Sequence, residues 1–208
     1  MGSKELWERR DHAPWAVREG IEPESRVPMK RDSAAGSPAV WIVLLLLVLV
    51  DVALHGAYFN IPDHVLRDFV HFWGLAKPCA VVIGWLAPDA GLTAQVGGLV
   101  GPGVNLVILR GCDGVGMMFL LISATVAASL ASRRWKTAAL GMLAATTVGY
   151  GLNLLRITAL YFIVANQPAW FATAHNLLLP LAIVLISGAF FLVWSNSLAA
   201  AGRKRTPT

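Results

Sequence analysis

The sequence predicts an all-α polytopic membrane protein with about four transmembrane helices, one interfacial or re-entrant helix and a short extended extracytoplasmic segment. Hydrophobic residues make up 56% of its 208 positions and charged residues only 14%, whereas a soluble domain carries about 25% charged residues. Apolar runs long enough to cross a bilayer recur along the chain. Most basic residues lie in the tails and in a short loop beside these runs, which indicates a membrane orientation signal rather than a nucleic-acid-binding surface.

The polar first segment, residues 1–38, is predicted to be a flexible cytoplasmic tail. It holds seven Lys/Arg, seven Asp/Glu and four prolines, with no apolar period long enough to form a helix face. A secretory signal would place its apolar run much nearer the start, so we expect no cleaved signal. Residues 39–195 then form one predicted membrane domain, and residues 196–208 form a basic cytoplasmic tail.

The loop after the second apolar run carries Arg133, Arg134 and Lys136, and positive charges in a short loop mark the cytoplasmic side. Both termini are therefore expected in the cytoplasm, and the second span is expected to begin on the extracytoplasmic side. The expected location is the cytoplasmic (inner) membrane. The predicted spans are four apolar segments, residues 39–59, 114–131, 137–164 and 176–194.

A further helical segment, residues 64–87, is expected not to cross the bilayer. Charged residues interrupt it, and a lysine such as Lys77 at the centre of a membrane helix costs about 2.5–3.5 kcal/mol on insertion scales. A full crossing would also conflict with the distribution of basic residues on the two sides of the membrane. We interpret this segment as an interfacial or re-entrant helix.

Residues 91–110 differ in composition from the apolar runs. They are rich in Gly, Val, Leu and Thr, with breakers at Gly97-Gly98 and Gly101-Pro102-Gly103. This pattern favours extended structure or a hairpin outside the helical bundle, to whose edge a peptide could add. A plain linker fits the composition equally well.

Cys112 lies in the stretch Leu109-Arg110-Gly111-Cys112-Asp113-Gly114-Val115-Gly116, at the junction between the extended segment and the second span. The thiolate is the nucleophilic form of cysteine, and the N-terminus of the following helix favours it. Asp113 opposes this by adding negative charge, which Arg110 is expected to offset. The other cysteine, Cys79, sits in apolar surroundings and is interpreted as an inert packing residue.

The third span carries a polar stripe. Tyr150, Asn153 and Arg156 recur every three residues and so share one helix face near its extracytoplasmic end. His175 follows a break in the chain and immediately precedes the last span, which begins on the same side. Taken alone, a cysteine is usually a packing residue, an arginine at a helix end usually reaches the headgroups, and a histidine before a span is usually interfacial. Their coincidence at one depth favours a site.

The chemistry available to these three residues is nucleophilic acyl transfer. His175 could deprotonate the Cys112 thiol and later protonate the leaving amine. Arg156 could stabilise the anionic oxygen of a tetrahedral intermediate in a partly dehydrated site. Asn153 and Asn176 are the candidates for orienting the His175 ring.

The ordered set Cys112-Asp113-Gly114, Asn153-Leu154-Leu155-Arg156-Ile157 and His175 resembles the exosortase/archaeosortase family of membrane cysteine transpeptidases, in particular its compact members, over roughly residues 40–195. The resemblance implies that Cys112 is the nucleophile, Arg156 the transition-state stabiliser and His175 the acid/base. Asp113 departs from the pattern, because a small neutral residue is expected at its position.

By the same resemblance, the substrate would be an exported protein with a C-terminal sorting signal, made of a short motif, a transmembrane helix and a basic cluster. The enzyme would sit in the lipid bilayer, cleave the signal through a thioacyl-enzyme and transfer the product to an amine acceptor. No cofactor or metal is expected, since the sequence holds no nucleotide-binding loop or metal-ligand cluster.

Other classes of function stay open at the level of sequence. A non-catalytic membrane scaffold or assembly factor would use the same spans without needing the cysteine. A redox protein would require Cys79 and Cys112 to approach each other, and a transporter would be expected to show an inverted repeat. His64 and His71, seven residues apart, could share a helix face, but two histidines alone more often face the headgroups than bind a metal.

Overall fold

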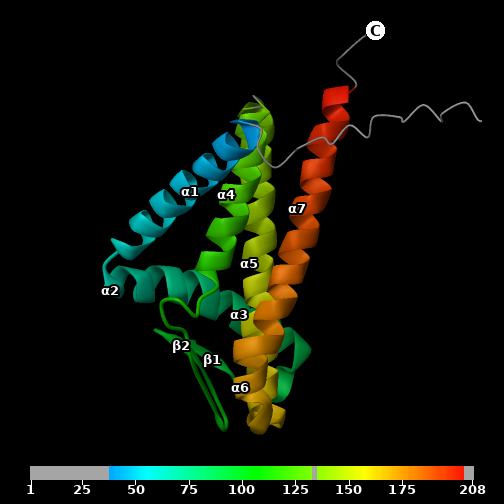
Figure 1. Ribbon diagram of the computed structural model, residues 1–208. Helices are drawn as coiled ribbons and strands as arrows, with labels where there is room; N and C mark the ends of the chain where they lie inside the picture. Colours follow the sequence, from blue (N-terminus) through cyan, green and yellow to red (C-terminus); the bar gives the residue numbers. More distant parts are fainter. Residues whose placement is uncertain (1–37, 133–134, 204–208) are drawn as a thin grey trace, which may run out of the picture. The chain divides into compact units, whose positions relative to one another are not determined.

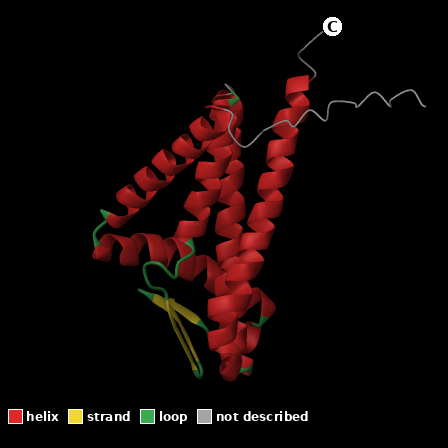
Figure 2. Ribbon diagram, viewed as in Figure 1, coloured by secondary structure: helices red, strands yellow, loops and turns green. Residues whose placement is uncertain are grey.

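The computed structural model describes residues 38–132 and 135–203. Its long helices are α1 (Pro38–Phe59), α4 (Val115–Ala131), α5 (Trp135–Asn166) and α7 (Leu179–Arg203). Figure 1 shows that the chain runs in one direction along α1 and α5 and in the opposite direction along α4 and α7. Figure 2 shows that, within these residues, strands are confined to one small sheet near one end of the helices. The predicted class, an all-α polytopic membrane protein, is confirmed.

The helical segment between α1 and the sheet comprises α2 (Asp63–Val65), the π-helix η2 (Leu66–Ala76) and α3 (Lys77–Leu86). Figure 1 shows this segment running across the direction of α4, α5 and α7, not alongside them. The Lys77 ammonium lies 3.5 Å from the centroid of the Trp73 ring and 5.2 Å from that of Phe72. This cation–π contact partly compensates a lysine in an apolar segment.

Among the described residues, length and composition make four helical segments candidates for crossing a membrane, namely Val40–Phe59, Asp63–Leu86, Trp135–Asn166 and Pro168–Ala200. This set includes residues 63–86, which the sequence analysis expects not to cross. It leaves out α4, whose 17 residues span about 25 Å at 1.5 Å per residue, slightly less than the hydrocarbon core. In the structure α4 packs along α5, whereas residues 63–86 run crosswise. That residues 63–86 do not cross the bilayer stays a prediction.

The extended segment expected within residues 91–110 is a three-stranded antiparallel sheet in the order β1-β2-β3. Gly97, with φ of +94°, and Gly103, with φ of +72°, make the two turns in the left-handed conformation that glycine adopts readily. The strands are β1 (Thr93–Gln95), β2 (Gly98–Gly101) and β3 (Val104–Val107).

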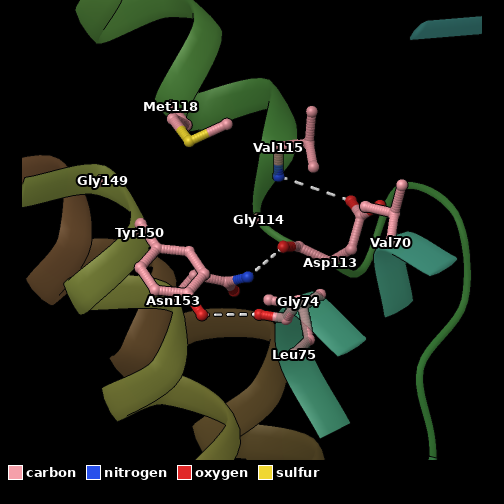
Figure 3. Close-up of a pocket in the computed structure, with 10 residues that line it drawn as sticks. All are labelled: Val70, Gly74, Leu75, Asp113, Gly114, Val115, Met118, Gly149, Tyr150 and Asn153. Carbon is pink, nitrogen blue, oxygen red and sulfur yellow. Dashed lines mark hydrogen bonds between the residues drawn. The ribbon is translucent and has the colours of Figure 1, made fainter. Parts of the chain in front are cut away.

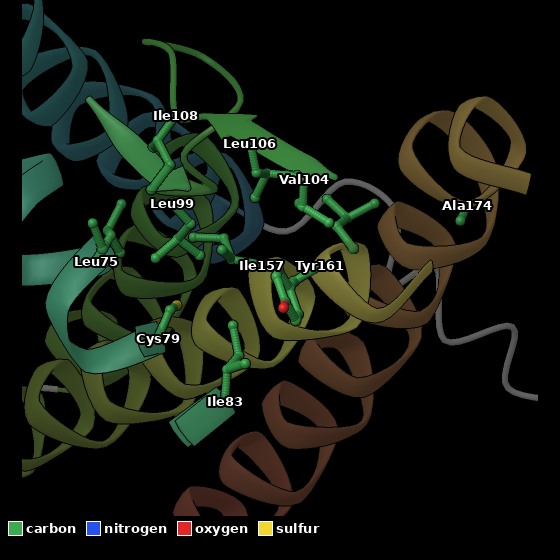
Figure 4. Close-up of a cluster of buried hydrophobic side chains, with 12 residues drawn as sticks. Leu75, Cys79, Ile83, Leu99, Val104, Leu106, Ile108, Ile157, Tyr161 and Ala174 are labelled. Atoms are coloured by element: carbon green, nitrogen blue, oxygen red, sulfur yellow. The ribbon is translucent and has the colours of Figure 1, made fainter. Parts of the chain in front are cut away.

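The main hydrophobic cluster lies between the sheet, α3 and α5 (Figure 4). Leu99 from β2, Cys79 and Ile83 from α3 and Tyr161 from α5 are buried in it. The predicted packing role of Cys79 is therefore confirmed. Because alternate residues of the sheet face this cluster, the sheet is held against the helices and fixes where the chain leaves β3.

A second cluster joins α4, α5 and α7 around Leu121, Ile122 and Ala145. On α5, a side chain at Gly141 would overlap the Trp194 ring of α7, so the two helices approach closely only because residue 141 is a glycine.

Four short elements in two connections complete the described secondary structure. The 3₁₀ turn η3 (Pro88–Ala90) leads into the sheet. After α5, the 3₁₀ turn η4 (Pro168–Trp170), α6 (Phe171–Thr173) and the π-helical η5 (Ala174–Leu178) run directly into α7. The predicted tail at residues 1–38, apart from its last residue, lies outside the described residues, as do Arg133, Arg134 and residues 204–208. Helix α7 reaches Arg203, beyond the predicted end of the membrane domain at residue 195.

Candidate active site

Cys112 lies in the loop that joins β3 to α4. Its N–H donates to the Leu109 carbonyl at 3.0 Å, which closes a turn. Gly111, with φ of +86°, and Gly114, with φ of +75°, flank it and bend the chain sharply on both sides. Of the two free cysteines, Cys112 is exposed and Cys79 is buried. The loop geometry therefore presents the thiol of Cys112 at the surface.

The next residue, Asp113, turns the other way and is only 1% exposed. Its carboxylate accepts hydrogen bonds from the Tyr58 hydroxyl of α1 and from the N–H of Val115 at 3.4 Å, and it lies 3.1 Å from Nε2 of His71 in η2. Burial alone raises the pKa of this carboxyl, but the contacts with His71, Tyr58 and Val115 outweigh burial and hold the pKa below its ordinary value. Asp113 is thus a buried carboxylate stabilised by three separate elements.

The polar stripe of α5 reaches backbone carbonyl groups of neighbouring segments. The Tyr150 hydroxyl donates to the Gly74 carbonyl at 2.7 Å, and the Asn153 amide donates to the Asp113 carbonyl (Figure 3). The Arg156 guanidinium donates from Nη1 to the Cys112 carbonyl at 3.2 Å and from Nη2 to the His175 carbonyl at 3.5 Å. One helix face therefore holds the cysteine loop and the start of the last helix together.

A small cavity of about 100 Å³ lies beside this contact, between η2, α4 and α5. Figure 3 shows the residues that line it, with the Asn153 amide and the Asp113 backbone at one wall and the Met118 side chain at another. The lining is predominantly apolar, and the Asp113 carboxylate next to it is shielded from bulk water by its burial.

His175 lies in η5, and its ring stacks on Phe171 with 5.3 Å between the centroids. Its Nδ1 atom and the Nε atom of Arg156 are buried without a hydrogen-bond partner among the described residues. Within the same part of the chain, no hydrogen bond joins the Cys112 thiol to the His175 ring. Catalytic hydrogen bonds are often formed only when the substrate is bound, and both unpaired N atoms are free to take a new partner.

The structure thus brings Cys112, Arg156 and His175 to one place, through the backbone carbonyls that Arg156 bridges. Asn153 holds the loop at Asp113, and Asn176 is exposed. Neither of these candidates for orienting the His175 ring makes a hydrogen bond to it.

The expectation that Arg110 would offset the charge of Asp113 needs correction. The guanidinium of Arg110 instead lies 2.8 Å from the Asp63 carboxylate. It also donates to the Phe59 carbonyl at the end of α1 and to the Ile61 carbonyl just after it. Tyr58 and His71 are the partners of Asp113.

Sequence reasoning missed Tyr58 altogether and interpreted His71 as a residue facing the headgroups, whereas His71 is 3% exposed. The two residues lie 55 and 42 positions from Asp113, so no local spacing connects them. The sequence did carry one signal, because Asp113 is a charged residue directly beside an apolar helix. Such a carboxylate requires hydrogen-bond donors from elsewhere in the fold.

Comparison with known protein families matches residues 72–194 to the family described as Transmembrane exosortase (Exosortase_EpsH). The matched range contains Cys112, Arg156 and His175 and excludes Tyr58 and His71. The searches of curated proteins and of solved structures found no match.

Replacement of Asp113 tests the buried carboxylate. We expect Asp113→Asn to lower the free energy of unfolding by about 1–3 kcal/mol at neutral pH, because hydrogen bonds to a charged acceptor are lost. The folded-state pKa of Asp113 lies below its ordinary value of about 4. The difference in unfolding free energy between the native chain and the variant should therefore be full above about pH 4 and should shrink as the pH falls through the lower folded-state pKa. Unfolding in detergent followed across this range checks it, with exposed Asp89→Asn as control. A pH-independent difference would contradict the interpretation.

Gly114 tests the contact between the loop and α5. A methyl group there would overlap the Asn153 side chain, and φ is positive, so Gly114→Ala should cost about 1–3 kcal/mol of unfolding free energy. Gly103→Ala is the matched control, because Gly103 also has positive φ but nothing lies within 4 Å of the added methyl. Thermal unfolding in detergent measures both. Equal losses would mean that the approach of Asn153 contributes nothing.

Proposed function

The chain belongs to the transmembrane exosortase family, and we propose that it is a membrane-embedded cysteine protease/transpeptidase that processes the C-terminal sorting signal of exported proteins. The substrate signal would comprise a short motif, a transmembrane helix and a basic cluster. The observation that carries the proposal is the Arg156 guanidinium, which donates to the carbonyls of both Cys112 and His175. It supports a site in which these residues act on one bond.

In the proposed reaction the Cys112 thiolate attacks the carbonyl carbon of the scissile peptide bond, after the thiol proton passes to His175. His175 returns this proton to the leaving nitrogen, so the C–N bond breaks and a thioester remains on Cys112. An amine acceptor then attacks the thioester and releases the thiol. The exposed position of Cys112 and the unpaired Nδ1 of His175 support these two roles.

Arg156 would stabilise the anionic oxygen that forms in each attack. A guanidinium has five N–H donors, and Arg156 uses Nη1 and Nη2 to hold the backbone while its Nε has no partner among the described residues. Its position is fixed before the substrate arrives, and a preorganised donor of this kind is the more effective one.

We further propose that the site faces the extracytoplasmic side of the cytoplasmic membrane. Helices α1, α4, α5 and α7 alternate in direction, so the Cys112 loop and the start of the last helical segment lie at the end opposite to residues 38 and 203 (Figure 1). The basic residues near both ends of the sequence and in the loop before α5 favour the cytoplasm for that other end. Exported proteins would meet the site after translocation.

Replacement of the cysteine tests the proposal directly. We expect unprocessed C-terminal helices of exported proteins to accumulate in host cells that carry Cys112→Ala, because no thioester can form. Mass spectrometry of the membrane proteome measures these tails and identifies the substrates.

Cys79→Ala is the matched control, because Cys79 is the second cysteine but packs in the hydrophobic cluster away from the loop. Cells with this variant should resemble those with the native chain. If Cys112→Ala leaves the proteome unchanged as well, the cysteine is not a nucleophile and a non-catalytic scaffold becomes the better interpretation.

Arg156→Lys tests the bridging guanidinium. A lysine ammonium cannot donate to two carbonyls and an oxyanion in the same planar arrangement, so processing should slow by about 10²-fold or more. The rate at which newly made substrate loses its tail, followed by pulse labelling, measures this. The opposite exchange, Lys136→Arg, at the other end of α5, should leave the rate unchanged. A rate near that of the native chain would rule out the proposed role of Arg156.

A further inference from the structure

A groove of about 460 Å³ lies beside the candidate active site, between η2 and the end of the sheet. One wall consists of Arg67 and other residues of the crosswise helical segment. The other wall consists of Val107, Ile108, Leu109 and Arg110, which carry the chain from β3 toward Cys112. Cys112 follows Val107 by five positions, and five extended residues reach at most about 17 Å. The groove therefore lies within a few peptide units of the thiol.

The strand at this groove has an open edge. β3 is the last strand of the sheet, and the N–H of Ile108 donates to the Gly97 carbonyl at 2.8 Å, just beyond the paired residues Gly98 and Val107. Successive residues of an antiparallel strand direct their backbone groups to opposite sides, so the N–H and C=O of Val107 point away from β2. An extended peptide arriving at this edge would find two main-chain partners.

The two arginines of the groove are already paired. The Arg110 guanidinium lies 2.8 Å from the Asp63 carboxylate, and the Nε of Arg67 lies 2.9 Å from the Asp68 carboxylate. Both arginines are therefore compensated by carboxylates, which makes the groove a poor site for a phosphate or another free anion. The polar groups of the groove that have no partner among the described residues are the exposed His64 ring and the uncharged backbone edge.

Large apolar side chains stand exposed at the same place. Val107 is 58% exposed and Leu109 is 60% exposed, whereas the alternate residues Leu106 and Ile108 are buried. A strand that presents exposed apolar side chains together with unpaired backbone groups has the properties of a surface that receives another strand.

We propose that this groove and the open edge of β3 bind the extended segment of the substrate on the N-terminal side of the scissile bond. The inference rests on the proposed function. The substrate's transmembrane helix lies on the C-terminal side of that bond and must remain with the helical bundle, so only the preceding segment can reach the sheet. This segment is the acyl part of the thioester, and the groove would hold it until the amine acceptor attacks Cys112.

Cross-linking in host cells tests the contact with the full-length chain. A photoreactive benzoylphenylalanine replaces Val107 in the Cys112→Ala background, where uncleaved substrate accumulates. The cross-linked peptides should map to the few residues immediately before the cleavage site, as defined by the mature termini in cells with the native chain. The same probe at Gln95, an exposed residue of β1, the opposite edge strand of the sheet, should not give these peptides. Cross-links from position 107 only to lipid, or to the substrate's transmembrane helix, would overturn the proposal.

A backbone substitution provides a second measurement. Val107→Pro removes the outward N–H and keeps the Ile108 hydrogen bond, so processing should slow about 2- to 10-fold, the equivalent of one net hydrogen bond. Ala94→Pro removes the corresponding outward N–H of β1 and should leave the rate as it is. Equal rates for both proline variants would overturn the proposal.

These outcomes are separable from failure of the proposed function. If Cys112→Ala causes tails to accumulate but position 107 does not contact the substrate, the transpeptidase stands and the groove is not its peptide site. If no tails accumulate with Cys112→Ala, both proposals fall.

Discussion

The buried carboxylate of Asp113 is the interaction on which the position of the cysteine loop depends. An ionised side chain that is 1% exposed is stable only where donors surround it, and here Tyr58, His71 and the N–H of Val115 supply them. These partners belong to the end of α1, to the crosswise π-helix and to the first turn of α4. Movement of any of these elements would leave the charge unpaired, so the loop between β3 and α4 is fixed relative to all of them.

The loop is fixed a second time through its backbone. The buried Asp113 carbonyl needs a donor, which Asn153 of α5 provides, and Arg156 on the same face of α5 donates to the Cys112 carbonyl. The two restraints act on the carboxylate and the main chain, and neither uses the thiol. The side chain that would do the chemistry is thereby left exposed on a rigid support, as preorganised catalysis requires.

The sequence predicted the parts of this structure that follow from periodicity and composition. The helices end within a few residues of the apolar runs, except that α7 continues to Arg203. The glycine-rich segment is extended, and the three-residue repeat of Tyr150, Asn153 and Arg156 lies on one face. It could not predict contacts that the tertiary fold creates, such as Tyr58 and His71 with Asp113. The pairing of Arg110 with Asp63 was not predicted for the same reason, since Asp113, the carboxylate nearer in sequence, is not the partner of Arg110.

An acidic residue directly after a candidate nucleophile looks unfavourable in sequence, because its negative charge would oppose a thiolate. In the structure the Asp113 carboxylate points away from the exposed Cys112 thiol, which weakens this effect. The Asp113 side chain points inward to its own donors, whereas the Arg156 guanidinium lies against the Cys112 carbonyl. The negative charge is thus compensated within the protein, and the cation is the charged group that contacts the cysteine residue. An aspartate at this position is therefore compatible with a reactive cysteine, provided that Tyr58 and His71 remain in place to hold it.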